Sequence, residues 1–151
     1  MGLDMTLTVK TGKGEKEIYW RKANHVHKWF VDNVQDKKDD CGEYKVEVSK
    51  LKELLKICKK IKADAIMKKG KIKEGMILNK ERGWKNIIKD GEIIKNPKLA
   101  KKLLPTAEGF FFGSFDYDQY YMNIIDHTIK ELTKIFEEYK KETTFTYNSS
   151  W

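Results

Sequence analysis

The sequence predicts an α+β fold, with an antiparallel or mixed sheet and helices packed mainly on one of its faces. Residues 3–10 alternate between apolar and polar side chains, as a half-buried strand does. The segment from Gln119 to Lys141 instead repeats apolar side chains every three or four residues, which is typical of an amphipathic helix. Strand-like and helix-like segments interleave along the chain, with hairpins near its start and in its middle, and this order indicates the α+β class.

The first half of the chain is predicted to form a β-hairpin, a helix, a third strand and a lysine-rich helix. A turn at Gly12 and Gly14 joins the hairpin strands, and Ser49 stands where the N-cap of the lysine-rich helix is expected. Five apolar residues of that helix form a stripe that faces the core. The predicted strands and first helix cover 3–10, 17–20, 21–35 and 43–48, and the stripe contains Leu51, Leu54, Leu55, Cys58 and Ile61.

The second half begins with a segment, residues 66–96, that carries four glycines and no helical period. Within it Asp90-Gly91 lies between two isoleucine pairs, which is the pattern of a two-residue hairpin turn. We therefore expect a β-hairpin inserted into a single domain that spans 1–151. After the hairpin we expect a short helix opened by Asn96-Pro97, a buried strand or close-packed loop at GFFFGS (109–114), a long helix capped by Asp116 with Gln119, and a strand at 143–147.

Composition narrows the class of protein. At 151 residues, 40% hydrophobic and 12% aromatic, the chain is long enough for one domain with a core and too apolar for a disordered segment. No apolar run approaches the roughly 18 residues that a membrane span needs, and the first residues do not form a signal peptide. Cys41 and Cys58 make no disulfide framework. These features predict a cytoplasmic protein that does not contact a membrane.

The net charge of +8 is concentrated in the lysine-rich helix and the residues after it. Between Lys50 and Lys73 lie ten lysines against Glu53 and Asp64, a local excess of 10 − 2 = +8. Only two of the 31 basic residues are arginines, although arginine is favoured for bidentate recognition of phosphates and bases. Lysines on the solvent side of the helix form either a solvated face or a surface that attracts an anionic partner such as a nucleic acid. These lysines are Lys52, Lys56, Lys59 and Lys60.

A series of blocks carries a family resemblance: MGLDM, YWRKAN, HKWFVDNVQD, DDCGEY, LLPT, GFFFGS and SSW. In this order they resemble a family of short uncharacterised proteins encoded by bacteriophages and prophages, over residues 1–64 and 97–151. The resemblance implies a phage context and no particular activity. The family has a histidine where this chain has His27 and usually a small residue at His25. It usually runs straight from the lysine-rich helix to the NPKLA-like turn, so 66–96 is expected to be an insertion.

The strongest candidate site lies at the start of the first predicted helix. Arg21, Lys22 and Asn24 fall in its first turn, where free backbone N–H groups and the helix dipole already favour an anion. Cations there weaken the helix and so indicate a function, although a salt bridge from Arg21 is the alternative. Nearby aromatic rings could stack on a base, or could belong to the core. The candidate ligand-binding residues are Trp20, Arg21, Lys22, Asn24, His27, Ser114, Tyr117 and Trp151, with Trp151 expected to be largely buried near Trp20 and the phenylalanine segment.

The same stretch also contains residues that occur in metal sites and in nucleophilic pairs. A metal site at His25 and His27 is unfavourable, because side chains two residues apart on a helix point about 200° away from each other. A nucleophilic pair of Cys41 with His27, oriented by Asp40 or Glu43, is conceivable. Its alternative is that Cys41 is a small hydrophobic residue and His27 a structural hydrogen bonder. The sequence contains no phosphate loop or dinucleotide fingerprint, so no cofactor is expected.

The resulting hypothesis is a small phage-encoded binding protein of the host bacterial cytosol. It would interfere with the host as an anti-defence protein that captures an anionic ligand, with a nucleotide as the first candidate. One alternative is an enzyme that uses His27 and Cys41, and another is a basic module that binds a host protein or nucleic acid. Homo-oligomerisation is left open.

Overall fold

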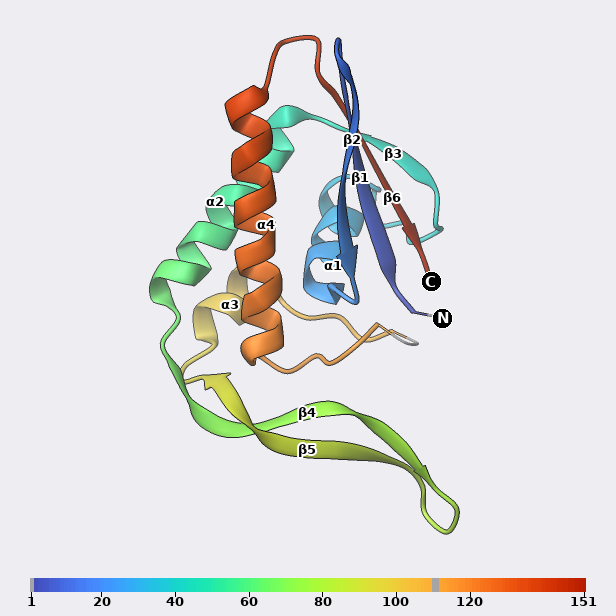
Figure 1. The fold of residues 1–151 in the computed structure, drawn as a ribbon, viewed down its shortest axis with the longest axis vertical. Coiled ribbons are helices and arrows are strands. Elements are labelled where there is room, and N and C mark those ends of the chain that lie inside the picture. The colour runs from blue at the N-terminus through green and yellow to red at the C-terminus, as the bar shows by residue number, and fades with distance from the viewer. Residues whose placement is uncertain (1, 110–111) are drawn as a thin grey trace.

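A computed structural model describes residues 2–109 and 112–151, and it confirms the α+β fold. Four strands form an antiparallel sheet in the order β2-β1-β6-β3. The predicted first hairpin is present, with Thr11 of β1 opposite Gly14 of β2. The helices lie on one side of this sheet, and a second, two-stranded sheet projects from the body (Figure 1). The strands of the main sheet are β1 (Asp4–Thr11), β2 (Gly14–Arg21), β3 (Glu43–Val46) and β6 (Thr144–Ser150).

The core lies between the inner face of the main sheet and its helices. Buried residues alternate along β1 and β6, so each strand turns one face inward. Tyr147 of β6 stacks on Phe30 with ring centroids 3.9 Å apart, and Trp20 of β2 meets Phe30 edge to face. The helices are α1 (Asn24–Asn33), α2 (Val48–Asp64), α3 (Lys98–Leu103) and α4 (Gln119–Glu138).

Two predicted helix caps are wrong by two residues. The N-cap of α4 is Asp118, whose carboxylate accepts hydrogen bonds from the N–H groups of Tyr120 and Tyr121, and not Asp116. Helix α2 already begins at Val48, so Ser49 lies inside the helix and is not its cap. In both places the chain has several polar residues near the helix start, and sequence pattern locates a helix boundary only to within a few residues.

The segment 66–96 forms the expected hairpin, made of β4 (Met67–Asn79) and β5 (Gly83–Ile94), which we call the arm. The predicted turn at Asp90-Gly91 is wrong, because both residues lie within β5 and the chain reverses between Asn79 and Gly83. The Asn79 side chain accepts hydrogen bonds from two backbone N–H groups of this turn, and Gly83 has a φ of 76°.

The base of the arm is attached to the body, whereas its far half is exposed. Ile72 and Ile94 are buried, and the Ile94 N–H donates to the Tyr117 carbonyl over 3.0 Å. From Gly75 to Ile88 every residue is exposed. Figure 1 shows this half of the arm extending away from the helices. A β-bulge between Lys73 and Gly75 marks the boundary between the two halves.

Within residues 2–109 and 112–151, no helix has both the length and the apolarity that crossing a bilayer demands.

Candidate functional site

Of the three residues predicted to bind an anion in the first turn of the first helix, only Asn24 lies in that helix. Strand β2 runs to Arg21, which pairs with Asp4 of β1, and helix α1 begins only at Asn24. Between them Lys22 has a φ of 53° and its N–H donates to the Leu3 carbonyl over 2.7 Å. Sheet pairing therefore overrides the helical pattern at this point. Arg21 and Lys22 are both exposed, and neither forms a salt bridge with any described residue.

Two of the candidate ligand-binding residues are buried and bonded within the protein. Trp20 is 1% exposed and its indole N–H donates to the Thr128 hydroxyl over 2.9 Å. Asn24 is also 1% exposed. Its amide N–H₂ donates to the carbonyls of Phe112 and Ser114, and its amide oxygen accepts from the Ala107 N–H at 3.0 Å. Asn24 thereby holds the segment around Phe112 against α1, which is a structural role.

Two further candidates, Ser114 and Tyr117, follow the same segment in the chain. Ser114 is exposed, and its hydroxyl accepts from the Asp116 N–H. Tyr117 is partly buried, and its hydroxyl accepts from the Thr106 N–H at 3.1 Å. Phe112 is buried, whereas the other two phenylalanines of the GFFFGS segment lie outside the described residues.

The expected burial of Trp151 is wrong, because its side chain is 54% exposed. Sheet pairing ends where Asp4 meets Ser150, so Trp151 lies beyond the last strand pair that could cover it. Its ring packs edge to face on Phe112 at 6.1 Å, and no ring contact joins it to Trp20 among the described residues. Its indole N–H donates to an Asp39 carboxylate oxygen over 2.9 Å.

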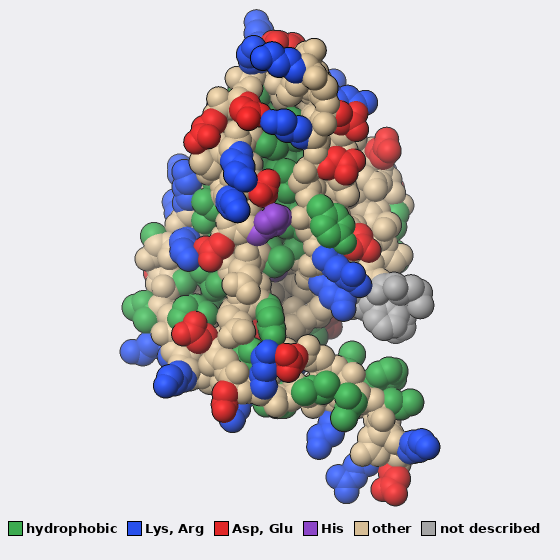
Figure 2. Space-filling view, viewed as in Figure 1, with side chains coloured by type: hydrophobic (Ala, Val, Ile, Leu, Met, Phe, Trp, Pro, Cys, Tyr) green, Lys and Arg blue, Asp and Glu red, His purple; other side chains and the backbone are tan. Residues whose placement is uncertain are grey.

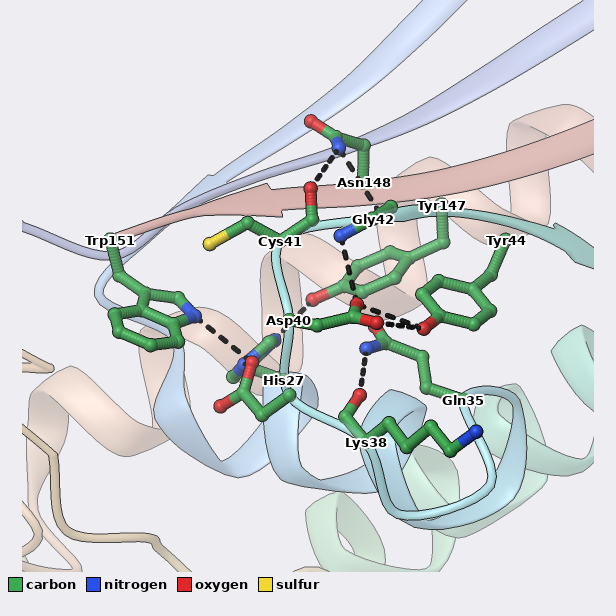
Figure 3. A network of polar contacts seen from close by, with 11 residues as sticks. His27, Gln35, Lys38, Asp40, Cys41, Gly42, Tyr44, Tyr147, Asn148 and Trp151 are labelled. Atoms are coloured by element: carbon green, nitrogen blue, oxygen red, sulfur yellow. Dashed lines mark hydrogen bonds and ion pairs between the residues drawn. The ribbon is translucent and has the colours of Figure 1, made fainter.

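His27 is the centre of a buried polar network (Figure 3). Its ring is 1% exposed, with Nδ1 2.6 Å from the Tyr147 hydroxyl and Nε2 2.9 Å from the same Asp39 oxygen that Trp151 contacts. The chain of contacts thus joins α1, the loop before β3, β6 and the C-terminal residue. With both ring nitrogens bonded, His27 acts as a structural hydrogen bonder in this arrangement.

Cys41 lies in the same loop, yet it does not complete a nucleophilic pair with His27. No hydrogen bond joins Cys41 to His27 among the described residues, and the acid that contacts the ring is Asp39 rather than Asp40 or Glu43. Asp40 instead accepts hydrogen bonds from the Tyr44 hydroxyl and the Gly42 N–H, which lower the pKa of its carboxyl. These contacts anchor the loop that carries Cys41.

Two hollows of the described surface lie away from all these residues. One, of about 220 Å³, is beside α4 and contains the Lys62–Asp126 salt bridge. The other, of about 560 Å³, lies between the β1–β2 turn and the end of α4, where Lys16 pairs with Glu138. Both contain charges of both signs, so neither is a selective anion pocket. Among the described residues, no group of three or more His, Cys, Asp or Glu side chains is placed to hold a metal ion.

The lysine face of α2, defined as Lys52, Lys56, Lys59 and Lys60, is positioned as the sequence predicts. Opposite this face the buried stripe of α2 packs into the core, which leaves all four lysines exposed. None of the four forms a salt bridge with a described residue. Two nearby acids pair with other lysines, since Glu53 pairs with Lys50 at 4.0 Å and Asp126 with Lys62 at 2.8 Å. Asp64, four residues after Lys60, is exposed and forms no salt bridge with a described residue.

Further lysines extend this surface beyond α2. Helix α3 packs beside α2 and adds exposed Lys98 and Lys102, while the start of β4 adds exposed Lys68 and Lys69. Exposed lysines therefore occur on the elements next to α2 as well as on α2 itself. No protein-family model, curated protein or solved structure matches the chain.

Proposed function

We propose that this protein is a binding protein that captures an anionic partner, and that the partner is a nucleic acid held on the lysine face of α2. The observation that carries the proposal is a helix face with four exposed lysines and no paired carboxylate among the described residues. An ammonium group with no paired carboxylate is available to an external anion, and neutralising phosphates releases counterions.

The spacing of the lysines suits an extended anion better than a single nucleotide. Lys52, Lys56 and Lys60 follow one another at intervals of four residues, so they lie one above the other at steps of about 6 Å along the helix. Duplex DNA carries one charge per about 1.7 Å of its axis, so each ammonium group can meet a separate phosphate. Lysine lacks the planar fork that reads bases, so the expected binding is independent of sequence.

The phage context belongs to the same proposal. The resemblance of the sequence to phage-encoded proteins suggests an infected bacterium as the setting, where capture of nucleic acid would interfere with a host defence. The nucleotide alternative has less support, because Trp20 and Asn24 are buried and already hydrogen-bonded within the protein.

The test is the salt dependence of binding to a labelled 12-bp duplex and a 12-nucleotide single strand, followed by fluorescence anisotropy. Changing all four lysines of the face to Gln should weaken binding at least tenfold. It should also reduce the slope of log K against log salt on the duplex by about 3 to 4, because four phosphate contacts are lost. A matched control changes four exposed lysines elsewhere to Gln: Lys13, Lys130, Lys140 and Lys141.

The control variant removes the same charge and should keep most of the affinity. Equal losses in both variants would show that net charge rather than the α2 face attracts nucleic acid. No binding of either nucleic acid by the wild-type protein at low salt would refute the proposal. Stabilisation by a mononucleotide in a thermal-shift assay, without binding to the duplex, would support the nucleotide alternative.

A further inference from the structure

The far half of the arm exposes more apolar surface than an isolated ribbon normally does. Figure 2 shows hydrophobic side chains gathered on the protruding arm. A two-stranded hairpin alone is marginal in water, and a third strand or a helix is usually needed to stabilise it. Large exposed apolar patches mark interaction sites. The exposed fractions are 58% for Met76, 53% for Ile77, 62% for Leu78, 69% for Trp84, 38% for Ile87 and 52% for Ile88.

The outer edge of β4 is protected from strand pairing only in its first half. Among the described residues, β4 pairs with β5 alone, so its other edge has no neighbouring strand. The half of β4 near the body carries Lys68, Lys69, Lys71 and Lys73, and lysines on an edge strand oppose pairing with another chain. The far half, Gly75–Asn79, reads GMILN and carries no charge. This uncharged stretch is open to an added strand.

We propose that the added strand is the same segment of a second copy, paired antiparallel about a twofold axis at Ile77. In this register Ile77 faces its own copy, Met76 faces Leu78, and Gly75 faces Asn79. Immediately outside them Glu74 of each copy faces Lys80 of the other, since 77 − 3 = 74 and 77 + 3 = 80. Within one copy Glu74 lies at the β-bulge and already pairs with Lys89 at 2.6 Å, so in the dimer its carboxylate lies between two lysines. The sequence EGMILNK is thus self-complementary in charge as well as apolar at its centre, as an isologous interface requires.

The lysines of the two copies lie far apart in this arrangement. From Glu74 to Ile88 the arm carries Lys80, Arg82 and Lys85 against Glu74 and Glu81, a net charge of 3 − 2 = +1. In an antiparallel pair, the four lysines of each β4 nearer the body lie along the strand away from the shared centre at Ile77. Lys71 lies six residues from Ile77, so the two copies of Lys71 are about 40 Å apart at roughly 3.4 Å per residue. That distance is several Debye lengths at physiological salt.

The pairing creates a four-stranded sheet in the order β5-β4-β4-β5. Each arm gains the third strand that its far half lacks, and the aliphatic side chains around Ile77 gain cross-strand neighbours. This inference goes beyond the proposed function, because it concerns the arm and does not use the lysine face of α2. Its failure would leave nucleic-acid binding by a single copy unaffected.

The first experiment measures oligomeric state by sedimentation velocity from 1 to 200 µM. We expect the wild-type protein to form dimers, and Ile77→Lys to remain monomeric because it places like charges opposite each other at the axis. Circular dichroism should show that the variant keeps its folded body. A wild-type protein that stays monomeric throughout this range would overturn the proposal.

A charge exchange tests the register itself. Glu74→Lys alone faces Lys80 and Lys80→Glu alone faces Glu74, so each single variant should dimerise at least tenfold more weakly. Mixing the two variants places opposite charges at both positions and should restore a heterodimer, as should the double variant with itself. The control Lys13→Glu makes the same charge change at an exposed lysine outside the arm and should remain dimeric. Failure of both the mixture and the double variant to recover dimers would exclude this register.

Discussion

At the scale of single residues, His25 is a buried group whose protonation is unfavourable in the folded protein. Its ring is 4% exposed, stacks on Tyr121 at 4.2 Å, and leaves Nε2 without a partner among the described residues. Burial lowers the pKa of His25 to about 3 from its ordinary 6.5. The unfolded chain therefore takes up a proton below pH 6.5 that the folded chain does not. Stability is complete above this pH and decreases as the pH falls towards 3.

We expect the free energy of unfolding to fall between pH 7.5 and pH 5.0 by about 2 kcal/mol more in the wild type than in His25→Leu. Urea denaturation at the two pH values measures the difference. His25→Gln is a second variant that keeps a polar group without a titrating ring, and it should behave like His25→Leu. If both variants lost as much stability as the wild type over this range, His25 would not be the cause.

The candidate residues show which side-chain roles the sequence can predict. The buried stripe of α2 and the exposed lysines opposite it follow from helical spacing, and both are confirmed. Asn24 and His27 instead depend on partners far along the chain, at Phe112, Ser114 and Tyr147. No local pattern identifies such partners. The sequence could therefore mark these residues as unusual but could not distinguish a ligand contact from an internal hydrogen bond.

At the scale of elements, Gly91 shows why the arm was predicted with the wrong turn. Asp-Gly between apolar pairs is a strong hairpin signal, yet here the glycine lies inside β5. A Cβ atom at Gly91 would come within 2.4 Å of Ile72 Cδ1 and 2.8 Å of the Gln119 side-chain oxygen. The glycine is needed for the close approach of the arm base to α4. A single sequence does not distinguish a glycine that forms a turn from one that allows close packing.

The arm also provides a prediction about how stability is distributed. Replacing Glu74–Ile87 by Asn-Gly would join Lys73 to Ile88, which already faces it across the ribbon, through a two-residue turn. The buried Ile72 and Ile94 remain, so we expect the free energy of unfolding to change by less than ~1 kcal/mol, as for exposed positions. Urea denaturation at 1 µM, where dimers should contribute little, measures this. A loss above ~3 kcal/mol would show that the far half of the arm supports the body.

At the scale of the whole molecule, the two proposals together describe a dimer with two lysine faces held apart by the arms. Met67, where the arm leaves the body, lies ten residues from Ile77. In the paired arrangement the two bodies are therefore separated by about 20 residues of strand, or roughly 70 Å. This equals about 20 bp of duplex at 3.4 Å per base pair. A single duplex can contact both faces only if it exceeds this length.

The length dependence of DNA binding therefore tests how the faces and the arms combine. We expect the wild-type protein to bind a 40-bp duplex at least tenfold more tightly than a 12-bp duplex per site, because the second face then binds the same molecule. Ile77→Lys should bind the 12-bp duplex as the wild type does, or slightly more tightly owing to its added charge, and should lose most of the preference for 40 bp. Anisotropy titrations at fixed salt measure both constants. A preference for 40 bp that persisted in Ile77→Lys would mean that one face occupies many positions along DNA and that the arms do not couple two faces.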